Sequence, residues 1–96
     1  MTRPLDEPLP PDRAKKLIVQ IVKSGRVDLR QRHLDRRMGE RAFTSVDVEN
    51  VLRGGWVESS EEAGGTWRYR VRTNHMVVVV AFRSSERLVV VTAWRL

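Results

Sequence analysis

The stretch TWRYRVRT, residues 66–73, alternates apolar and charged side chains through its middle. Two sets of residues share these positions, the apolar Trp67, Tyr69 and Val71 and the cationic Arg68, Arg70 and Arg72. A period of two is typical of a β-strand with one buried face. The stretch therefore predicts a strand whose arginines lie on the face opposite its aromatic residues.

Three more strands are predicted, one before this strand at residues 56–59 and two after it at residues 76–82 and 88–94. The last two, MVVVVAF and LVVVTAW, are apolar on both faces, which is typical of central strands. Because short polar turns separate all four strands, we expect them to pair as an antiparallel sheet.

Helical spacing marks the first half of the chain, where the expected helices are residues 11–24, 29–41 and 45–53. Asp28 can cap the second of these helices, and Thr44 with Asp47 can form a capping box at the start of the third. Helices followed by an antiparallel meander indicate an α+β domain. We expect the N-terminal helices to pack on one face of a four-stranded antiparallel sheet.

Length and composition bound what the protein can be. A chain of 96 residues has room for one hydrophobic core, expected at residues 11–96, and prolines at positions 4, 8 and 10 predict a flexible tail at residues 1–10. The chain has no cysteine and only two histidines, and no apolar run approaches the roughly 18 residues that span a bilayer. We therefore expect a cytoplasmic protein with no metal, no other cofactor and no membrane segment.

The charge balance points to an anionic partner. Lysine and arginine number 18 against 12 acidic residues, which gives a net charge of +6 and a pI near 11.0. Three of the 18 cations are lysines, so 18 minus 3 leaves 15 arginines. Arginine presents a planar fork of donors that suits phosphate and carboxylate groups. Nucleic acid, an acidic protein and a membrane surface are the partners that such a charge favours.

The segment RQRHLDRRMGER, residues 30–41, concentrates this basic character. His33, Arg37 and Arg41 repeat every four residues and would share one side of a helix. Metal-free RNA cleavage needs a general base and cations that stabilise the developing phosphate charge, so these three residues are the candidate catalytic set. The alternative is a solvated helix face with no catalytic role.

The second histidine, His75, is expected in the turn before a central strand. It is the candidate for a second acid or base if the fold brings it near His33, and otherwise it is an exposed turn residue.

The strand arginines and one tryptophan form a second candidate set. Arg68, Arg70 and Arg72 would follow one another about 6.7 Å apart along the strand, a spacing that suits successive phosphates. Trp94 ends the last strand and could stack on a base. The alternatives are a solvated sheet face for the arginines and the edge of the core for Trp94.

The order RHLDRRMGERAFTSVDVENVLRGG, then WRYRVR and VVVTAW, resembles a family of small bacterial domains called domain of unknown function 4258. That family is similar to the RelE-type ribonuclease toxins of toxin-antitoxin pairs. The resemblance covers roughly residues 29–94 and rests on three features, namely His33, Arg37, Met38 and Arg41 in helix order, residues 44–48 opening the next helix, and the ending at residues 92–94. It implies a RelE-like fold, metal-independent endoribonuclease activity on mRNA and an antitoxin protein as partner.

A non-catalytic nucleic-acid or protein binding module is the alternative function. Helices at residues 29–41 and 45–53 followed by a hairpin are similar in order to a winged helix-turn-helix DNA binder. Asp47 and Glu49 oppose that interpretation, because acidic side chains disfavour entry of a helix into the major groove.

Overall fold

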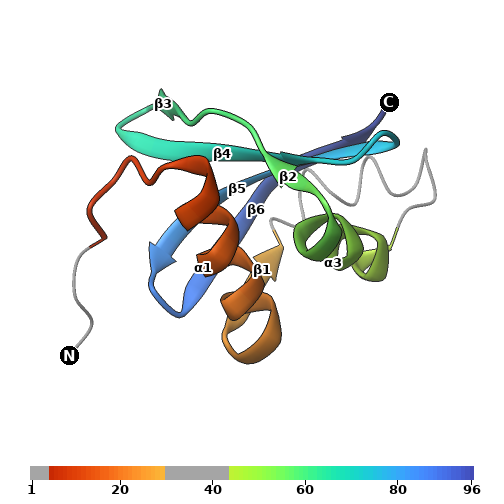
Figure 1. The fold of residues 1–96 in the computed structure, drawn as a ribbon, viewed down its shortest axis with the longest axis horizontal. Coiled ribbons are helices and arrows are strands. Elements are labelled where there is room, and N and C mark those ends of the chain that lie inside the picture. Colours follow the sequence, from red (N-terminus) through yellow and green to blue (C-terminus); the bar gives the residue numbers. More distant parts are fainter. Residues whose placement is uncertain (1–4, 30–43) are drawn as a thin grey trace.

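The computed structural model describes residues 5–29 and 44–96. These ranges contain two helices and six strands (Figure 1). In chain order, the elements are α1 Pro11–Ser24, β1 Arg26–Leu29, α3 Ser45–Gly54, β2 Trp56–Val57, β3 Glu61–Ala63, β4 Thr66–Arg72, β5 Met76–Ser84 and β6 Arg87–Arg95. The α+β class expected from the sequence is therefore confirmed.

The sheet is mixed rather than wholly antiparallel. Its strands follow the order β1-β6-β5-β4-β2, and β3 pairs with β4 outside that path. The meander of β4, β5 and β6 is antiparallel as expected, whereas β1 runs parallel to β6. The expected sheet of four antiparallel strands is not confirmed, because β1 and β3 are short strands that form through their pairing with distant or adjoining strands.

The expected start of the second helix is wrong. Leu29, the first residue expected in that helix, lies in β1 and pairs with Val90. The carboxylate of Asp28, expected as its cap, instead accepts hydrogen bonds from the side chains of Arg26 and Arg87. The rest of that helix falls outside the described residues and stays a prediction.

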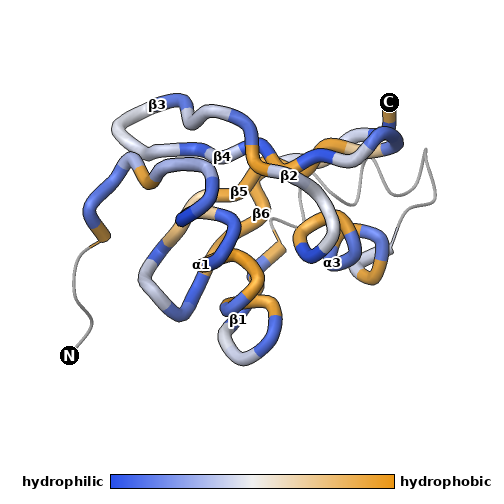
Figure 2. Tube along the Cα trace, in the orientation of Figure 1, coloured by the Kyte–Doolittle hydropathy of each residue, from blue (hydrophilic) through white to orange (hydrophobic). Residues whose placement is uncertain are grey.

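Helices α1 and α3 cover one face of the sheet (Figure 1). Each has apolar residues on the side that packs on the strands (Figure 2). The sheet presents Tyr69 and Val71, both fully buried, from β4. The Tyr69 ring packs on Phe82 with their centroids 5.0 Å apart. The alternation expected in β4 is confirmed, because Arg70 between these two residues is exposed.

The start of α3 is also as expected. The side chain of Thr44 accepts a hydrogen bond from the backbone N–H of Asp47 at 3.3 Å, and Thr44 N–H donates to the Asp47 carboxylate at 2.8 Å. This reciprocal pair is the capping box that satisfies two donors at a helix end.

The opposite face of the sheet carries a smaller apolar cluster of Val79, Ala81, Val89 and Val91. We call this side of the sheet the second face. The residues that lie on it depend on an irregularity in β6, where Val79 pairs with Thr92 but Val80 pairs with Val90. Val91 is thus an extra residue in the ladder, as in a β-bulge. We call the apolar cluster between the helices and the sheet the main core. Val90 and Ala93 both lie in it, so the residues between them, Val91 and Thr92, turn to the second face.

Residues 5–9 lie against the main core. Leu5 and Leu9 pack on it, the N–H of Leu9 donates to the Tyr69 hydroxyl at 3.0 Å, and that hydroxyl donates to the Glu7 carboxylate at 2.8 Å. The division into a flexible tail at residues 1–10 and a domain at residues 11–96 stays a prediction.

Neither described helix has both the length and the apolar character needed to pass through a membrane.

Candidate functional site

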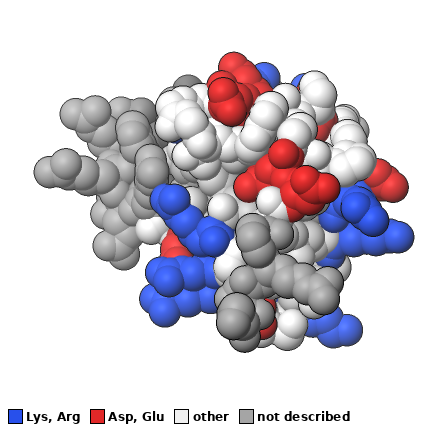
Figure 3. All heavy atoms as spheres, turned by 90° about the vertical axis from the view of Figure 1, so that its left-hand side faces the viewer, with Lys and Arg blue, Asp and Glu red and all other residues white. Residues whose placement is uncertain are grey.

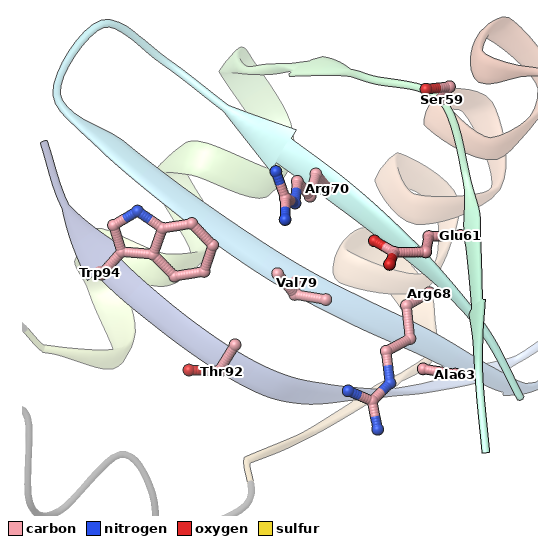
Figure 4. A pocket seen from close by; sticks show the side chains of 8 residues that line it. All are labelled: Ser59, Glu61, Ala63, Arg68, Arg70, Val79, Thr92 and Trp94. Carbon is pink, nitrogen blue, oxygen red and sulfur yellow. The ribbon is translucent and has the colours of Figure 1, made fainter.

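A hollow of about 180 Å³ lies on the second face of the sheet (Figure 4). Its lining comes from β3, β4, β5, β6 and the connection before β3. The lining residues are Ser59, Glu61, Ala63, Arg68, Arg70, Val79, Thr92 and Trp94. We call it the arginine hollow. It contains three of the four residues that the sequence suggested for nucleic-acid binding.

The strand register explains why these side chains meet. Arg70 pairs with Val79, and Val79 pairs with Thr92, so the three lie in one row across β4, β5 and β6. Tyr69 and Val71 turn to the main core, which leaves the intervening Arg70 on the second face. The apolar side chain of Val79 therefore forms the floor between a guanidinium and a hydroxyl.

Arg70 and Trp94 interact directly across this floor. The guanidinium carbon of Arg70 lies 5.8 Å from the centre of the Trp94 ring. A cation–π contact at an exposed position is worth about 0.5–1 kcal/mol. The contact places a cation beside an aromatic ring at the edge of the hollow, and the Arg70 guanidinium forms no ion pair with any described residue.

Glu61 supplies the acidic group of the hollow. It pairs with Arg68 across β3 and β4, and in Figure 4 its carboxylate lies between the side chains of Arg68 and Arg70. No ion pair within the described part of the chain includes either arginine. Two cations less one carboxylate leave the hollow with a net charge of +1.

Arg72 is set apart from the other two strand arginines. Its guanidinium carbon lies 5.7 Å from the Trp56 ring centre, and its Nη1 lies 3.8 Å from Glu58 Oε1. Its Nε is buried without a hydrogen-bond partner among the described residues. Arg72 thus follows Arg68 and Arg70 along β4 but binds a neighbouring tryptophan and carboxylate and does not line the hollow.

His75 lies in the turn between β4 and β5, exposed to solvent. Its backbone N–H donates to the Thr73 hydroxyl at 3.1 Å, and its carbonyl accepts from Leu96 N–H at 2.9 Å. Its side chain does not line the hollow. The other candidate catalytic residues, His33, Arg37 and Arg41, fall outside the described residues, and their role stays a prediction.

Three polar residues of the hollow were not singled out from the sequence as site residues. In the sequence, Glu61 begins the segment EEAGG, residues 61–65, whose composition is typical of a turn, and Ser59 ends the strand expected at residues 56–59. Thr92 is the one polar residue within the apolar run VVVTAW, and that interruption was the available signal. Within residues 5–29 and 44–96, no group of three His, Asp or Glu side chains could hold a metal ion.

Comparison with protein-family models matches residues 31–95 to the family described as "Domain of unknown function (DUF4258)". The chain belongs to this family. The matched range includes α3, every strand from β2 to β6 and therefore the whole arginine hollow of this DUF4258 domain, whereas α1 and β1 precede it. No curated protein and no solved structure matches the chain significantly.

Proposed function

We propose that this protein binds single-stranded RNA in the arginine hollow and, as a RelE-like domain, acts as the mRNA-cleaving toxin of a toxin-antitoxin pair. The observation that carries the binding part is the pairing of the Arg70 guanidinium with the Trp94 ring beside Arg68. Fixed cations favour phosphate binding, and a flat aromatic surface favours stacking of a base. The hollow has both on one face of the sheet.

Arginine chemistry favours phosphate as the group bound. Each guanidinium has five N–H donors, and no carboxylate of the described residues forms an ion pair with Arg68 or Arg70. Charge-assisted bonds from arginine to phosphate are often bidentate and about twice as strong as neutral ones.

The size of the hollow favours a polymer over a free small molecule. Its volume of about 180 Å³ is below the roughly 300–1,000 Å³ of pockets that enclose a drug-sized ligand. It could take one phosphate or part of one nucleotide, so useful affinity requires further contacts along a strand. A single strand also leaves its bases free to stack on Trp94, which a duplex does not.

The hydroxyl groups of Thr92 and Ser59 favour RNA over DNA. A hydroxyl donates one hydrogen bond and can accept up to two, and the ribose 2′-hydroxyl has the same capacity. DNA lacks that group and would leave the two side chains without the corresponding partner.

The cleavage part of the proposal rests on the sequence and on the resemblance to RelE-type toxins. His33 would deprotonate the 2′-hydroxyl, while Arg37 and Arg41 would stabilise charge on the phosphate. His75 remains a candidate for the acid that protonates the leaving oxygen. An antitoxin with an acidic or helical segment would cover the basic surface and block the site.

Fluorescence anisotropy with labelled single-stranded RNA tests the binding part. Arg70→Ala should weaken binding roughly tenfold and lower the slope of log affinity against log salt by about 0.7, the value for one phosphate contact on a single strand. Trp94→Ala should also weaken binding, while Trp94→Phe should retain most of it because a ring remains.

Two further variants make the test specific. Glu61→Gln removes the carboxylate beside the two arginines and should strengthen binding about two- to fivefold, a gain that misfolding cannot produce. Arg13→Ala removes one exposed cation from α1, on the other side of the sheet, and serves as the matched charge control. Binding that is equally sensitive to Arg13→Ala and Arg70→Ala would exclude the hollow as the site.

Cleavage is tested separately with labelled RNA and duplex DNA in the presence of a chelator. Loss of RNA cleavage in a His33→Ala variant that still binds RNA would support the toxin. RNA binding without cleavage would instead support a non-catalytic binding module, which one observation favours: His75, the one histidine among the described residues, does not line the arginine hollow.

A further inference from the structure

A second group of arginines lies on the same face of the sheet, where β1 meets β6. The Asp28 carboxylate lies between two guanidinium groups, accepting from Arg26 Nε through Oδ1 at 2.9 Å and from Arg87 Nε through Oδ2. We call these three residues the arginine bridge. Beside it a wider hollow of about 540 Å³ is lined by Asp28, Leu29, Arg83, Arg87 and Val89.

Alternation along the strands places this group on the second face. Val27 and Leu29 pack on the main core, so Asp28 between them points the other way. Leu88 is also in the main core, so Arg87 points to the same side as Asp28. Figure 3 views the end of the molecule that carries the β5–β6 turn. It shows basic side chains gathered at the lower left, with acidic atoms against them.

Most donors of the bridge arginines have no partner among the described residues. Asp28 engages only the Nε of each arginine, so four of the five N–H donors on each guanidinium are unbonded within residues 5–29 and 44–96. The side chains of Arg26 and Arg87 are 71% and 51% exposed, whereas that of Asp28 is 25% exposed. Two cations less one carboxylate give +1, and Arg83, in no ion pair among the described residues, raises the local charge to +2.

The carboxylate also holds the two cations in place. Two guanidinium groups so close would repel each other, and the shared carboxylate offsets that repulsion while restricting both side chains. A pair of arginines fixed in this way loses less conformational entropy when it binds an anion. Asp28 also has its pKa lowered, chiefly by the hydrogen bond from Arg87, so it stays charged while it does so.

The two hollows lie at opposite ends of one apolar cluster. Val79 lines the arginine hollow, Val89 lines the wider one, and both belong to the cluster on the second face. Thr92 and Arg87 are five residues apart on β6, which corresponds to about 16 Å at roughly 3.3 Å per residue. One nucleotide cannot reach both places, but a strand of several nucleotides can.

We propose that the arginine bridge and Arg83 form a second phosphate-binding site, which holds the backbone of the same RNA strand whose other part occupies the arginine hollow. This inference rests on the proposed RNA binding and names its substrate as an oligonucleotide rather than a mononucleotide. A purely structural role, in which Asp28 ties β1 to β6, accounts for the two Nε contacts but not for Arg83, which takes no part in them.

Anisotropy with two RNA lengths tests the inference. One RNA has about 12 nucleotides, within the roughly 4–16 that a single-strand binding domain covers, and the other is a dinucleotide. Arg83→Ala should weaken binding of the longer RNA about fivefold and lower its salt slope by about 0.7, and it should leave dinucleotide binding unchanged. Arg83 is exposed, so its removal should not alter the thermal unfolding midpoint.

Arg87→Lys provides a second variant with the charge retained. Lysine is a point charge without the planar fork, so this variant should also weaken binding of the longer RNA while the contact with Asp28 persists. Arg13→Ala again serves as the control for loss of one cation on the helix side of the sheet.

The outcomes separate the two proposals. If Arg70→Ala weakens both RNAs while Arg83→Ala behaves like Arg13→Ala, the arginine hollow stands and the second site is refuted. If neither RNA binds the wild-type protein, the proposed function is refuted and the second site with it. Loss confined to the longer RNA in both the Arg83 and Arg87 variants supports the second site.

Discussion

Replacing Tyr69 with phenylalanine should remove an alkaline loss of stability that the wild-type protein shows. The Tyr69 side chain is fully buried, with its hydroxyl held between the Leu9 N–H and the Glu7 carboxylate. Burial is the main reason that the pKa of Tyr69 rises to about 12, and the hydrogen bond to Glu7 with its negative charge adds to the rise. The Leu9 N–H acts in the opposite direction.

The sign and size of the effect follow from the two states. The pKa of tyrosine in an unfolded chain is about 10. Below that pH both states keep the proton, so the free energy of unfolding includes the full contribution of Tyr69. Above it the unfolded state loses its proton first, and stability falls by about 1.4 kcal/mol at about pH 11 and by at most about 2.7 kcal/mol once the folded state also titrates near pH 12.

At neutral pH the same substitution should lower the free energy of unfolding by about 1–3 kcal/mol, because the Leu9 N–H and the Glu7 carboxylate lose their partner while packing on Phe82 remains. Urea unfolding followed by circular dichroism at several pH values measures both effects. Since Tyr69 is the only tyrosine, its near-ultraviolet absorbance reports its titration directly. A titration midpoint near 10, or wild-type and variant stabilities that fall in parallel above pH 10, would refute the reasoning.

Three further predictions concern the elements around the sheet, each measured by urea unfolding. Gly25→Ala should lower the free energy of unfolding by about 1–3 kcal/mol, because its Cβ would overlap the Glu86 carbonyl oxygen, whereas Gly54→Ala, with open space around its Cβ, should raise it by up to about 1 kcal/mol. Equal effects of the two alanines would contradict this packing. Lys15→Met should lower the free energy of unfolding by about 1–3 kcal/mol, because the ammonium donates to three backbone carbonyls at the end of α3. Amide hydrogen exchange should quicken first at the end of α3. Asp28→Asn should flatten the acid side of the stability profile. The pKa of Asp28 is lowered in the folded protein, chiefly by the hydrogen bond from Arg87. The contribution of Asp28 to the free energy of unfolding is therefore complete above the unfolded pKa and is lost as pH falls through the folded pKa. An unchanged acid profile in the variant would contradict this contribution.

Strong local patterns predicted most of the fold. The alternation in β4, the apolar runs of β5 and β6 and the capping box of α3 each involve residues adjacent in sequence. Such patterns reflect local geometry and one-sided burial, which the sequence records directly. The helix expected at residues 11–24 is confirmed for the same reason.

The short strands β1 and β3 were not predicted from the sequence, because they form through pairing with other strands. β1 has four residues, and its partner residues in β6 lie about 60 positions later, so no local pattern marks it. Asp28 is a good cap in isolation, but two arginines bind its carboxylate in the folded chain. β3 has the composition of a turn and becomes a strand because the adjoining glycines return the chain onto β4.

Arg68 and Arg70 of the candidate site were predictable from the sequence and Thr92 was not, and one extra residue in β6 explains why Thr92 was missed. With regular alternation Thr92 and Trp94 would share a face with Leu88 and Val90, which lie in the main core. The bulge at Val91 reverses the faces beyond it, so Ala93 enters the core while Thr92 and Trp94 meet Arg70 on the other side. Bulges commonly redirect a side chain beside a functional site. Trp94 therefore lies beside Arg70 because the ladder is irregular at Val91, and a sequence interpretation that assumes a regular strand places that ring in the hydrophobic core.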